Sequence, residues 1–219
     1  MRHSSSTSPL TRRGFIALSA LGLTACATGV RAADLVPTPA QMEGPFYPDK
    51  LPLDQDNDLV LIQGRMDPSK GIVTHLHGRI LGPDGKPVIG AVIEIWQCDA
   101  NGVYLHTRGG DRAKLDAGFQ GIGRFQVGDD GNYRFRTIRP VAYPGRAPHI
   151  HVKIRHGETE LLTTQCYVAG DPGNERDGIL RSFTDEAVRK SIVIDFTPKG
   201  DQGELAAQFD VVLGKTPKA

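Results

Sequence analysis

The two histidines of His149-Ile150-His151 are the first candidates for chemistry in this sequence. In a β-strand, residues i and i+2 project from the same face, so the two imidazoles could bind one metal ion together. A second pair, His75 and His77, has the same spacing, which shows that the pattern by itself is weak. No Tyr, Asp, Glu or Cys lies close to that second pair in the sequence, and we interpret it as an ordinary strand face.

A tyrosine and an arginine precede the first pair. Tyr143 and Arg146 lie in the run RPVAYPGRAP (139–148), whose prolines and Gly145 would fix its path and let it turn sharply at the entrance to a strand. A phenol has a pKa of about 10 and becomes a phenolate ligand only where a strong Lewis acid replaces its proton. Hard anionic oxygen donors favour ferric iron over ferrous iron, zinc or copper(I). The competing interpretations are a polar strand face for the histidines and a loop aromatic for Tyr143.

The elements that must position these residues have the pattern of short strands. Glycine (26) and proline (15) are plentiful, and long apolar helical patterns are few, which favours β-structure with many turns. Strands are predicted at 72–81, 91–97, 132–138, 149–155, 160–168, 191–196 and 208–213. Only 185–190 has a helical pattern. We therefore expect an all-β protein, a β-sandwich of about seven to eight strands with long loops.

The organisation along the chain divides it into three parts. Residues 34–70 contain six prolines and an acidic run, and we interpret them as an extended N-terminal arm that wraps the core. Residues 71–219 would form one sandwich domain. Charged residues are balanced (26 basic, 25 acidic; net charge +1), which gives no sign of a nucleic-acid or membrane-surface binder. The extended arm is consistent with association of chains into a homo-oligomer.

Residues 1–33 have the features of an export signal. A basic, polar start is followed by the uncharged run GFIALSALGLTACA (14–27), too short for a transmembrane span. The paired arginines Arg12 and Arg13 are typical of a twin-arginine signal, so we expect an exported, periplasmic or envelope-associated protein. Cleavage after Ala32 or Ala33, or lipidation of Cys26 in a lipoprotein-type sequence, are the alternatives. Cys98 and Cys166 would remain, as a disulfide or as two buried thiols.

At this point the sequence resembles the intradiol ring-cleavage dioxygenases, most closely the chains of the protocatechuate 3,4-dioxygenase type. Five segments carry the resemblance and run in order through most of the chain. They are EGPFYP (43–48), GKPVIGAVIEIWQCDANGVYLH (85–106), FQGIGRFQVGDDGNYRFRTIRP (119–140), YPGRAPHIHVKI (143–154) and LLTTQCYVAGDP (161–172).

The resemblance implies an all-β catalytic domain that binds iron(III). In that family two tyrosinates and two histidines hold the metal. Matched residue by residue, the implied ligands are Tyr104, Tyr143, His149 and His151. The substrates implied are a small aromatic diol and O2, and the product is a muconate-type diacid, cleaved between the two hydroxyl-bearing carbons.

The resemblance also implies roles for residues around the metal. Tyr143 would leave the metal and accept a substrate proton. Arg146 would stabilise negative charge on the ring, and Gln165 would orient a ligand or the substrate. The alternatives are a surface-loop cation for Arg146 and a glutamine that satisfies backbone groups of the sandwich for Gln165. Tyr47 would line the substrate pocket or pack within the arm. Trp96 is interpreted as a core residue.

Two departures from the family pattern concern the substrate. Only six residues separate Tyr143 from His149, and Gly145 stands where the protocatechuate enzyme's catalytic chain carries a tryptophan in a longer loop. The long helical N-terminal domain of the catechol 1,2-dioxygenases is absent. The pocket wall is therefore expected to be more open.

Two other functions compete with a dioxygenase. Residues 85–97 also resemble strands of transthyretin-like and carbohydrate-binding sandwiches, so a non-catalytic binding module is one alternative. The other is an envelope protein that binds zinc or copper through the histidine pair. Neither alternative has a use for Tyr143, so changing this residue to phenylalanine separates them from the dioxygenase.

Overall fold

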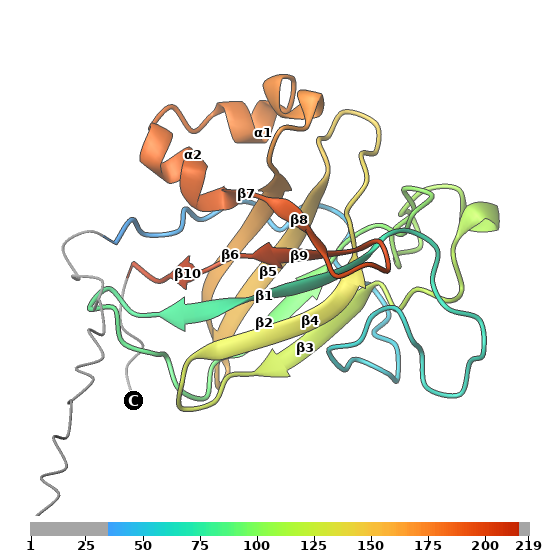
Figure 1. Ribbon diagram of the computed structural model, residues 1–219, viewed down its shortest axis with the longest axis horizontal. Helices are drawn as coiled ribbons and strands as arrows, with labels where there is room; N and C mark the ends of the chain where they lie inside the picture. The colour runs from blue at the N-terminus through green and yellow to red at the C-terminus, as the bar shows by residue number, and fades with distance from the viewer. Residues whose placement is uncertain (1–34, 215–219) are drawn as a thin grey trace, which may run out of the picture.

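Two β-sheets pack around one hydrophobic core in the computed structural model, which describes residues 35–214 (Figure 1). The first sheet contains β1 (Val73–Leu81), β4 (Asn132–Ile138), β8 (Phe196–Lys199), β9 (Glu204–Gln208) and β10 (Val211–Val212). The second contains β2 (Val92–Trp96), β3 (Ile122–Gln126), β5 (His149–His156), β6 (Thr159–Val168) and β7 (Val193–Ile194). The predicted all-β sandwich is confirmed. The export signal predicted for residues 1–33 lies outside the described residues.

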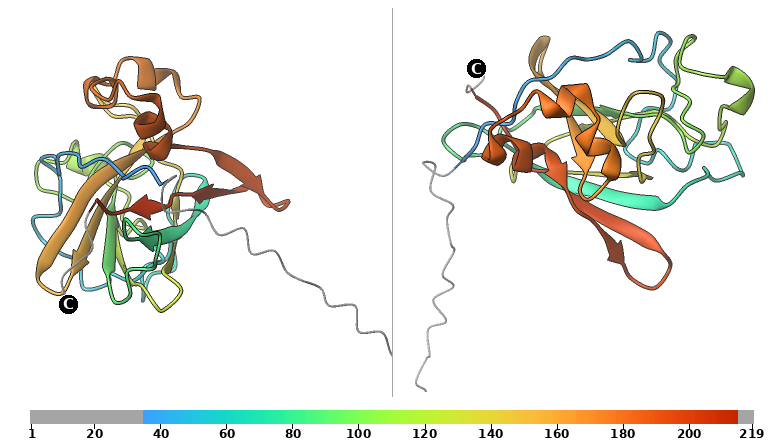
Figure 2. Two further views of the ribbon diagram at one scale, coloured as in Figure 1. Left: turned by 90° about the vertical axis from the view of Figure 1, so that its left-hand side faces the viewer. Right: turned by 90° about the horizontal axis from the view of Figure 1, so that it is seen from above.

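Strand β1 organises the first sheet. It pairs antiparallel with β4 and parallel with both β9 and β10, while β8 and β9 form an antiparallel hairpin. Figure 2 shows this hairpin reaching away from the body of the molecule. The second sheet has the order β3-β2-β5-β6-β7, and its central strand is β5.

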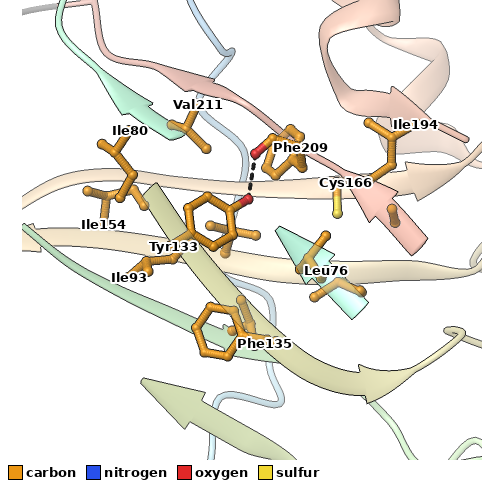
Figure 3. Close-up of a cluster of buried hydrophobic side chains, with 14 of the residues drawn as sticks. Leu76, Ile80, Ile93, Tyr133, Phe135, Ile154, Cys166, Ile194, Phe209 and Val211 are labelled. Atoms are coloured by element: carbon orange, nitrogen blue, oxygen red, sulfur yellow. Dashed lines mark hydrogen bonds between the residues drawn. The ribbon is translucent and has the colours of Figure 1, made fainter. Parts of the chain in front are cut away.

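Alternation along β5 separates the core from the face that matters for chemistry. Ile150 and Val152 belong to the core cluster, which also contains Ile93 of β2 and Leu76 of β1 (Figure 3). With a period of two, His149 and His151 must project from the opposite face of the sheet. Strand β5 is nevertheless buried on both faces along His149–Ile154, because other parts of the chain cover its outer side.

The cover of that outer face is the N-terminal arm. Between Leu35 and Ile72 the chain forms no helix or extended strand. Gln41 ties this segment to β6 through two hydrogen bonds. Its main-chain N–H donates to the Thr163 carbonyl (2.8 Å), and its side-chain amide donates to the Gln165 carbonyl (2.8 Å). Glu43 pairs with the buried Lys153 of β5. Residues 41–47 thus lie across the strand that carries the histidine pair.

The helix predicted at 185–190 is α2 (Glu186–Ile192), but it is not the only helical segment among residues 35–214. A second helix, α1 (Gly178–Arg181), and 3-10 turns at Arg112–Lys114 and Pro172–Glu175 were not predicted. A four-residue helix is too short to show an apolar period.

The strands predicted at 191–196 and 208–213 are also corrected. Helix α2 continues to Ile192, so only Val193 and Ile194 remain for β7, and β8 begins at Phe196. The second stretch divides into the end of β9 and β10. Strand β3 was not predicted. Among residues 35–214, no helix has the length and apolar character required to cross a membrane.

Candidate metal centre

The predicted ligands lie on the outer face of the second sheet, beneath the arm. His149 and His151 are 1% and 2% exposed. His151 is paired with Trp96 of β2 and with Gln165 of β6, so these two side chains project from the same face of the sheet. Two loops complete the surroundings: residues 97–121 carry Tyr104, and residues 139–148 carry Tyr143.

The four side chains converge on one small volume. The Nε2 atoms of His149 and His151 are 3.1 Å apart, and the Tyr104 hydroxyl lies 3.1 Å from Nε2 of His151 and 3.5 Å from Nε2 of His149. The Tyr143 ring lies 5.3 Å from that of Tyr104 and 5.5 Å from that of His149, measured between centroids. The structure therefore brings together all four residues that the sequence singled out.

Hydrogen bonding sets the tautomer of His149. Its Nδ1 lies 2.6 Å from the carbonyl oxygen of Ala147. A carbonyl can only accept, so Nδ1 carries the proton and Nε2 presents its lone pair to the cluster. The orientation of His151 has a different origin: its ring stacks on Trp96, with centroids 4.7 Å apart and planes at 11°. Nε2 of His151 lies beside Nε2 of His149, so both imidazoles present this atom to the cluster.

Burial keeps these groups neutral. It lowers the pKa of His149 to about 4, with the charge of Arg146 adding to the effect, and lowers the pKa of His151 well below its ordinary value. Burial also raises the pKa of Tyr104 well above 10, and Cys98 and Tyr143 raise it further. The phenol would then ionise only where a strong Lewis acid replaces the proton on its oxygen.

The donor set fits ferric iron. Within residues 35–214, no three His, Cys, Asp or Glu side chains are grouped so that they could hold a metal ion. The side chains that converge with the histidine pair and could complete a metal site are the two tyrosines. Hard phenolate oxygens with imidazoles suit iron(III) better than zinc, whose sites are built from Cys, His and carboxylates.

A tight loop holds Tyr104. Its main-chain N–H donates to the Gly109 carbonyl (2.8 Å), and the Arg112 guanidinium donates to the Tyr104 carbonyl (3.1 Å). A Cβ at Gly109 would lie 2.8 Å from that of Tyr104, so only glycine permits this approach. The backbone of the loop thereby directs the phenol into the cluster.

A turn places Tyr143 beside Arg146. The Arg146 N–H donates to the Tyr143 carbonyl (3.0 Å), with Pro144 and Gly145 between them, and Gly145 has a φ of 82°. Proline followed by a glycine of positive φ is the signature of a type II turn. The Arg146 side chain then donates to the Tyr143 hydroxyl (3.3 Å). Nothing lies within 4 Å of a Cβ built on Gly145, and the more open pocket wall stays a prediction.

Gln165 contacts Arg146 and the arm. Its Oε1 accepts from the Arg146 guanidinium (2.6 Å), and its Nε2 donates to the Met42 carbonyl (3.0 Å). Tyr47 lies outside the cluster: its hydroxyl donates to Glu94 (2.9 Å), and its ring packs against Trp96.

Three residues near the cluster were missed in the sequence. Phe46, next to Tyr47, stacks on Tyr104 with centroids 5.1 Å apart, and Tyr167 and Asp177 both contact Arg146 (3.2 and 2.8 Å). The only signal for Phe46 was its place in the EGPFYP segment (43–48), where the pocket role was predicted for the neighbouring Tyr47 instead. Nothing in the sequence connects Asp177 with Arg146, 31 residues away.

The remaining candidates lie apart from the cluster. His75 and His77 are on β1 of the first sheet, where His75 pairs with Glu204 (2.7 Å) and His77 is exposed, as expected of an ordinary strand face. Cys98 and Cys166 are both buried and free, so the structure has two thiols and no disulfide between them.

Comparison with known proteins identifies the family. A sequence model of the family described as Dioxygenase (Dioxygenase_C) matches residues 42–215. The beta chain of protocatechuate 3,4-dioxygenase from Burkholderia cepacia is 39% identical over 149 residues, which cover 62% of each chain. This chain belongs to the intradiol ring-cleavage dioxygenases. The intradiol chain is also 34% identical, over 167 residues, to 6-chlorohydroxyquinol 1,2-dioxygenase from Cupriavidus pinatubonensis, covering 68% of this chain and 56% of that protein.

A solved structure extends the likeness to three dimensions. The dioxygenase domain of a dioxygenase carbohydrate-binding protein fusion from Streptomyces sp. SirexAA-E is 32% identical, with a TM-score of 0.63. The match covers 82% of this intradiol chain and 99% of that domain. By contrast, the chain spans only 62% and 56% of the length of the two curated relatives, so their complete activities are not transferred with the family.

Proposed function

We propose that this protein is a non-haem iron(III) dioxygenase that uses O2 to open a catechol-type ring between its two hydroxyl-bearing carbons, yielding a muconate-type diacid. The observation that carries the proposal is the convergence of two phenols with two imidazole Nε2 atoms on one buried sheet face, where the Nε2 atoms are 3.1 Å apart. Membership of the intradiol family supports the same reaction class.

Tyr104, Tyr143, His149 and His151 would hold the iron. Bound iron(III) would supply the Lewis acidity that ionises the phenols and the redox partner that makes a catecholate reactive toward O2. Tyr143 is the candidate to leave the metal, because it is only half-buried whereas Tyr104 is 1% exposed. A released Tyr143 phenolate would accept one catechol proton.

Arg146 would balance the negative charge that follows. Its guanidinium already contacts the Tyr143 hydroxyl (3.3 Å). Burial lowers the pKa of Arg146, but Tyr167, Asp177 and Tyr143 outweigh burial and raise it above its ordinary value, so the cation persists. A fixed cation beside the substrate position stabilises charge that develops on the ring.

The test is a visible spectrum of the iron-loaded protein before and after anaerobic addition of catechol or protocatechuate. We expect a burgundy tyrosinate-to-iron band that shifts to longer wavelength with a true substrate. Tyr143→Phe should weaken the band and abolish ring cleavage. His149→Asn should lose iron, whereas the matched control His77→Asn, on the first sheet, should keep both iron and colour. A colourless protein with stoichiometric iron would sink the proposal and favour a non-catalytic binding module.

The substrate assay also addresses the subtype. We propose an enzyme of the protocatechuate type, on the basis of the 39% identical relative. The open turn at Gly145 would admit larger phenolics than the longer loop of that branch. A colour change with catechol alone, and none with protocatechuate, would contradict the subtype while leaving the iron chemistry intact.

We also propose that the protein is exported by the twin-arginine route, because Arg12 and Arg13 precede an uncharged run. Replacing both arginines with lysine should keep the protein in the cytoplasm, as measured by cell fractionation. Unchanged distribution of the double variant would refute the export route.

A further inference from the structure

A buried carboxylate outside the four ligands organises the loop that carries two of the site's residues. Asp177 is 1% exposed and follows the 3-10 turn Pro172–Glu175. Both of its oxygens are fully engaged, each by two donors. A carboxylate held by four donors has a fixed position and stays ionised.

One oxygen, Oδ2, faces the metal loop. It accepts from Arg146 Nε (2.8 Å) and from the main-chain N–H of Ala147 (2.9 Å). The Ala147 carbonyl in turn accepts the Nδ1 proton of His149 (2.6 Å). A single atom therefore holds both the Arg146 cation and the N–H of Ala147, the residue whose carbonyl orients one imidazole.

The other oxygen, Oδ1, faces a helix. It accepts from the main-chain N–H groups of Ile179 and Leu180 (3.0 Å each), which makes Asp177 the N-cap of α1. Leu180 is fully buried in the core cluster. Asp177 is thus attached to the hydrophobic core through α1, and this attachment fixes the position of Oδ2.

The other contacts of Arg146 show why this anchor matters. One terminal nitrogen donates to Gln165 (2.6 Å) and Tyr167 (3.2 Å), and the other faces Tyr143. A planar guanidinium held by Nε on one edge and by a terminal nitrogen on the other has only one orientation left. Without the Nε contact it could rotate about the remaining bonds and turn away from Tyr143.

We propose that Asp177 is a positioning residue of the metal centre: it holds the Arg146 guanidinium against Tyr143 and aligns the Ala147 carbonyl that orients His149. The inference rests on the proposed function for its catalytic consequence. Its structural consequence, the alignment of Arg146 and His149, concerns the protein alone.

The test compares Asp177→Asn with Asp185→Asn. Asp185 is a matched control, because it caps α2 through one N–H (Val188, 3.0 Å) and makes no contact with the metal loop. In Asp177→Asn, one of the two acceptor oxygens becomes an NH2 group, which cannot accept from Arg146 and Ala147 when it takes the place of Oδ2. We expect kcat to fall about 10- to 100-fold, the usual range for residues that orient metal ligands. The tyrosinate-to-iron band should shift in Asp177→Asn and stay unchanged in Asp185→Asn.

A double variant isolates the connection through Arg146. If Asp177 acts partly through Arg146, the loss in kcat caused by Asp177→Asn should be smaller in an Arg146→Gln background, where only the route through Ala147 and His149 remains. Full additivity of the two losses, or a spectrum and kcat for Asp177→Asn equal to those of Asp185→Asn, would overturn the inference.

A measurement on the iron-free protein separates this inference from the proposed function. The Nδ1 proton of His149 should give an exchange-protected NMR signal in the wild type and in Asp185→Asn, and lose that protection in Asp177→Asn. Should Asp177→Asn not fold, Asp177→Ser retains the helix cap but lacks Oδ2, and the same loss is expected. A protected signal in the Asp177 variant would refute the positioning role, even if the wild-type protein proves to be a dioxygenase. A colourless wild type with the expected NMR signals would refute only the proposed function.

Discussion

At the residue scale, the two histidine pairs show what distinguishes a site from a pattern. Both pairs lie on strands at positions i and i+2, so the local geometry is the same. His149 and His151 are buried among phenols with their Nε2 atoms facing each other, whereas His75 pairs with Glu204 near solvent. Chemistry therefore depends on what the loops and the arm place over the strand.

The cysteines give a prediction at the same scale. Burial raises the pKa of both Cys98 and Cys166 to about 12, with Asp99 contributing at Cys98. Thiolates react and thiols do not, so neither residue should be alkylated by iodoacetamide in the native protein at pH 8. Both should react after unfolding in urea, as read by peptide mass mapping. Rapid native labelling, or a disulfide-linked peptide pair, would contradict the structure.

The same shift implies a dependence of stability on pH. The folded-state pKa of each thiol is raised above its ordinary value of 9.0. The unfolded chain therefore releases these protons first as the pH rises, and the free energy of unfolding should fall between about pH 9 and pH 12. Urea titrations at pH 8 and pH 10 test this, and a Cys166→Ala variant should show a smaller difference between them.

At the element scale, the arm is what converts an outer sheet face into an enclosed site. Gly44 lies against His151, where a Cβ would approach to 3.4 Å, and Phe46 stacks on Tyr104. The arm has no secondary structure of its own, so single main-chain hydrogen bonds, such as that from Gln41 to Thr163, and side-chain contacts hold it to the sheets. One charge contact joins Glu43 to Lys153, whose side chain is only 7% exposed.

That contact gives a prediction for the arm. Glu43→Gln should leave Lys153 with Glu160 alone, at 3.5 Å, and lower the free energy of unfolding by about 1 kcal/mol, since Glu43 is itself half-exposed. Hydrogen exchange of the Gln41 amide should accelerate, because the arm is released locally. Glu158→Gln, an exposed glutamate with no ion pair in the described structure, is the matched control. Equal exchange in both variants would show that Glu43 does not hold the arm.

At the scale of the whole molecule, the sandwich core and the candidate site occupy opposite faces of one sheet. Tyr133 of β4 donates its hydroxyl to the Phe209 carbonyl, in the segment between β9 and β10 (Figure 3). Gly78 of β1 lies at the same crossing. A Cβ there would overlap the Phe209 carbonyl oxygen and lie 2.6 Å from its carbonyl carbon. Two strands, β1 and β4, thus meet the segment between β9 and β10 where no side chain fits.

Gly78→Ala should therefore destabilise the whole sandwich. The added methyl would force the backbone at Phe209 away and weaken the Tyr133 hydrogen bond, at a cost of about 3 kcal/mol, at the upper end for overpacked cores. Thermal unfolding measures the effect, and Gly214→Ala, with nothing within 4 Å of its Cβ, is the control. Similar melting temperatures for the two variants would contradict the close approach at this crossing.

Much of this fold could be predicted because strand alternation is a local property. Strand β4 matched its predicted bounds, and β5 extended only one residue further. Prediction failed where local patterns are short. Helix α1 has four residues, and the run 208–213 alternates like one strand although the chain turns at Phe209 to cross β1.

The sequence by itself determined the donor types and the faces on which they project: two imidazoles one pleat apart, with a phenol and a cation in a turn just before them. These follow from backbone periodicity and turn chemistry, which act over a few residues. Only the tertiary structure decided what surrounds the donors. Phe46 and Asp177 come from segments 103 and 28 residues from His149. Packing of the arm and loops onto one sheet face, rather than any local rule, brings them to the site.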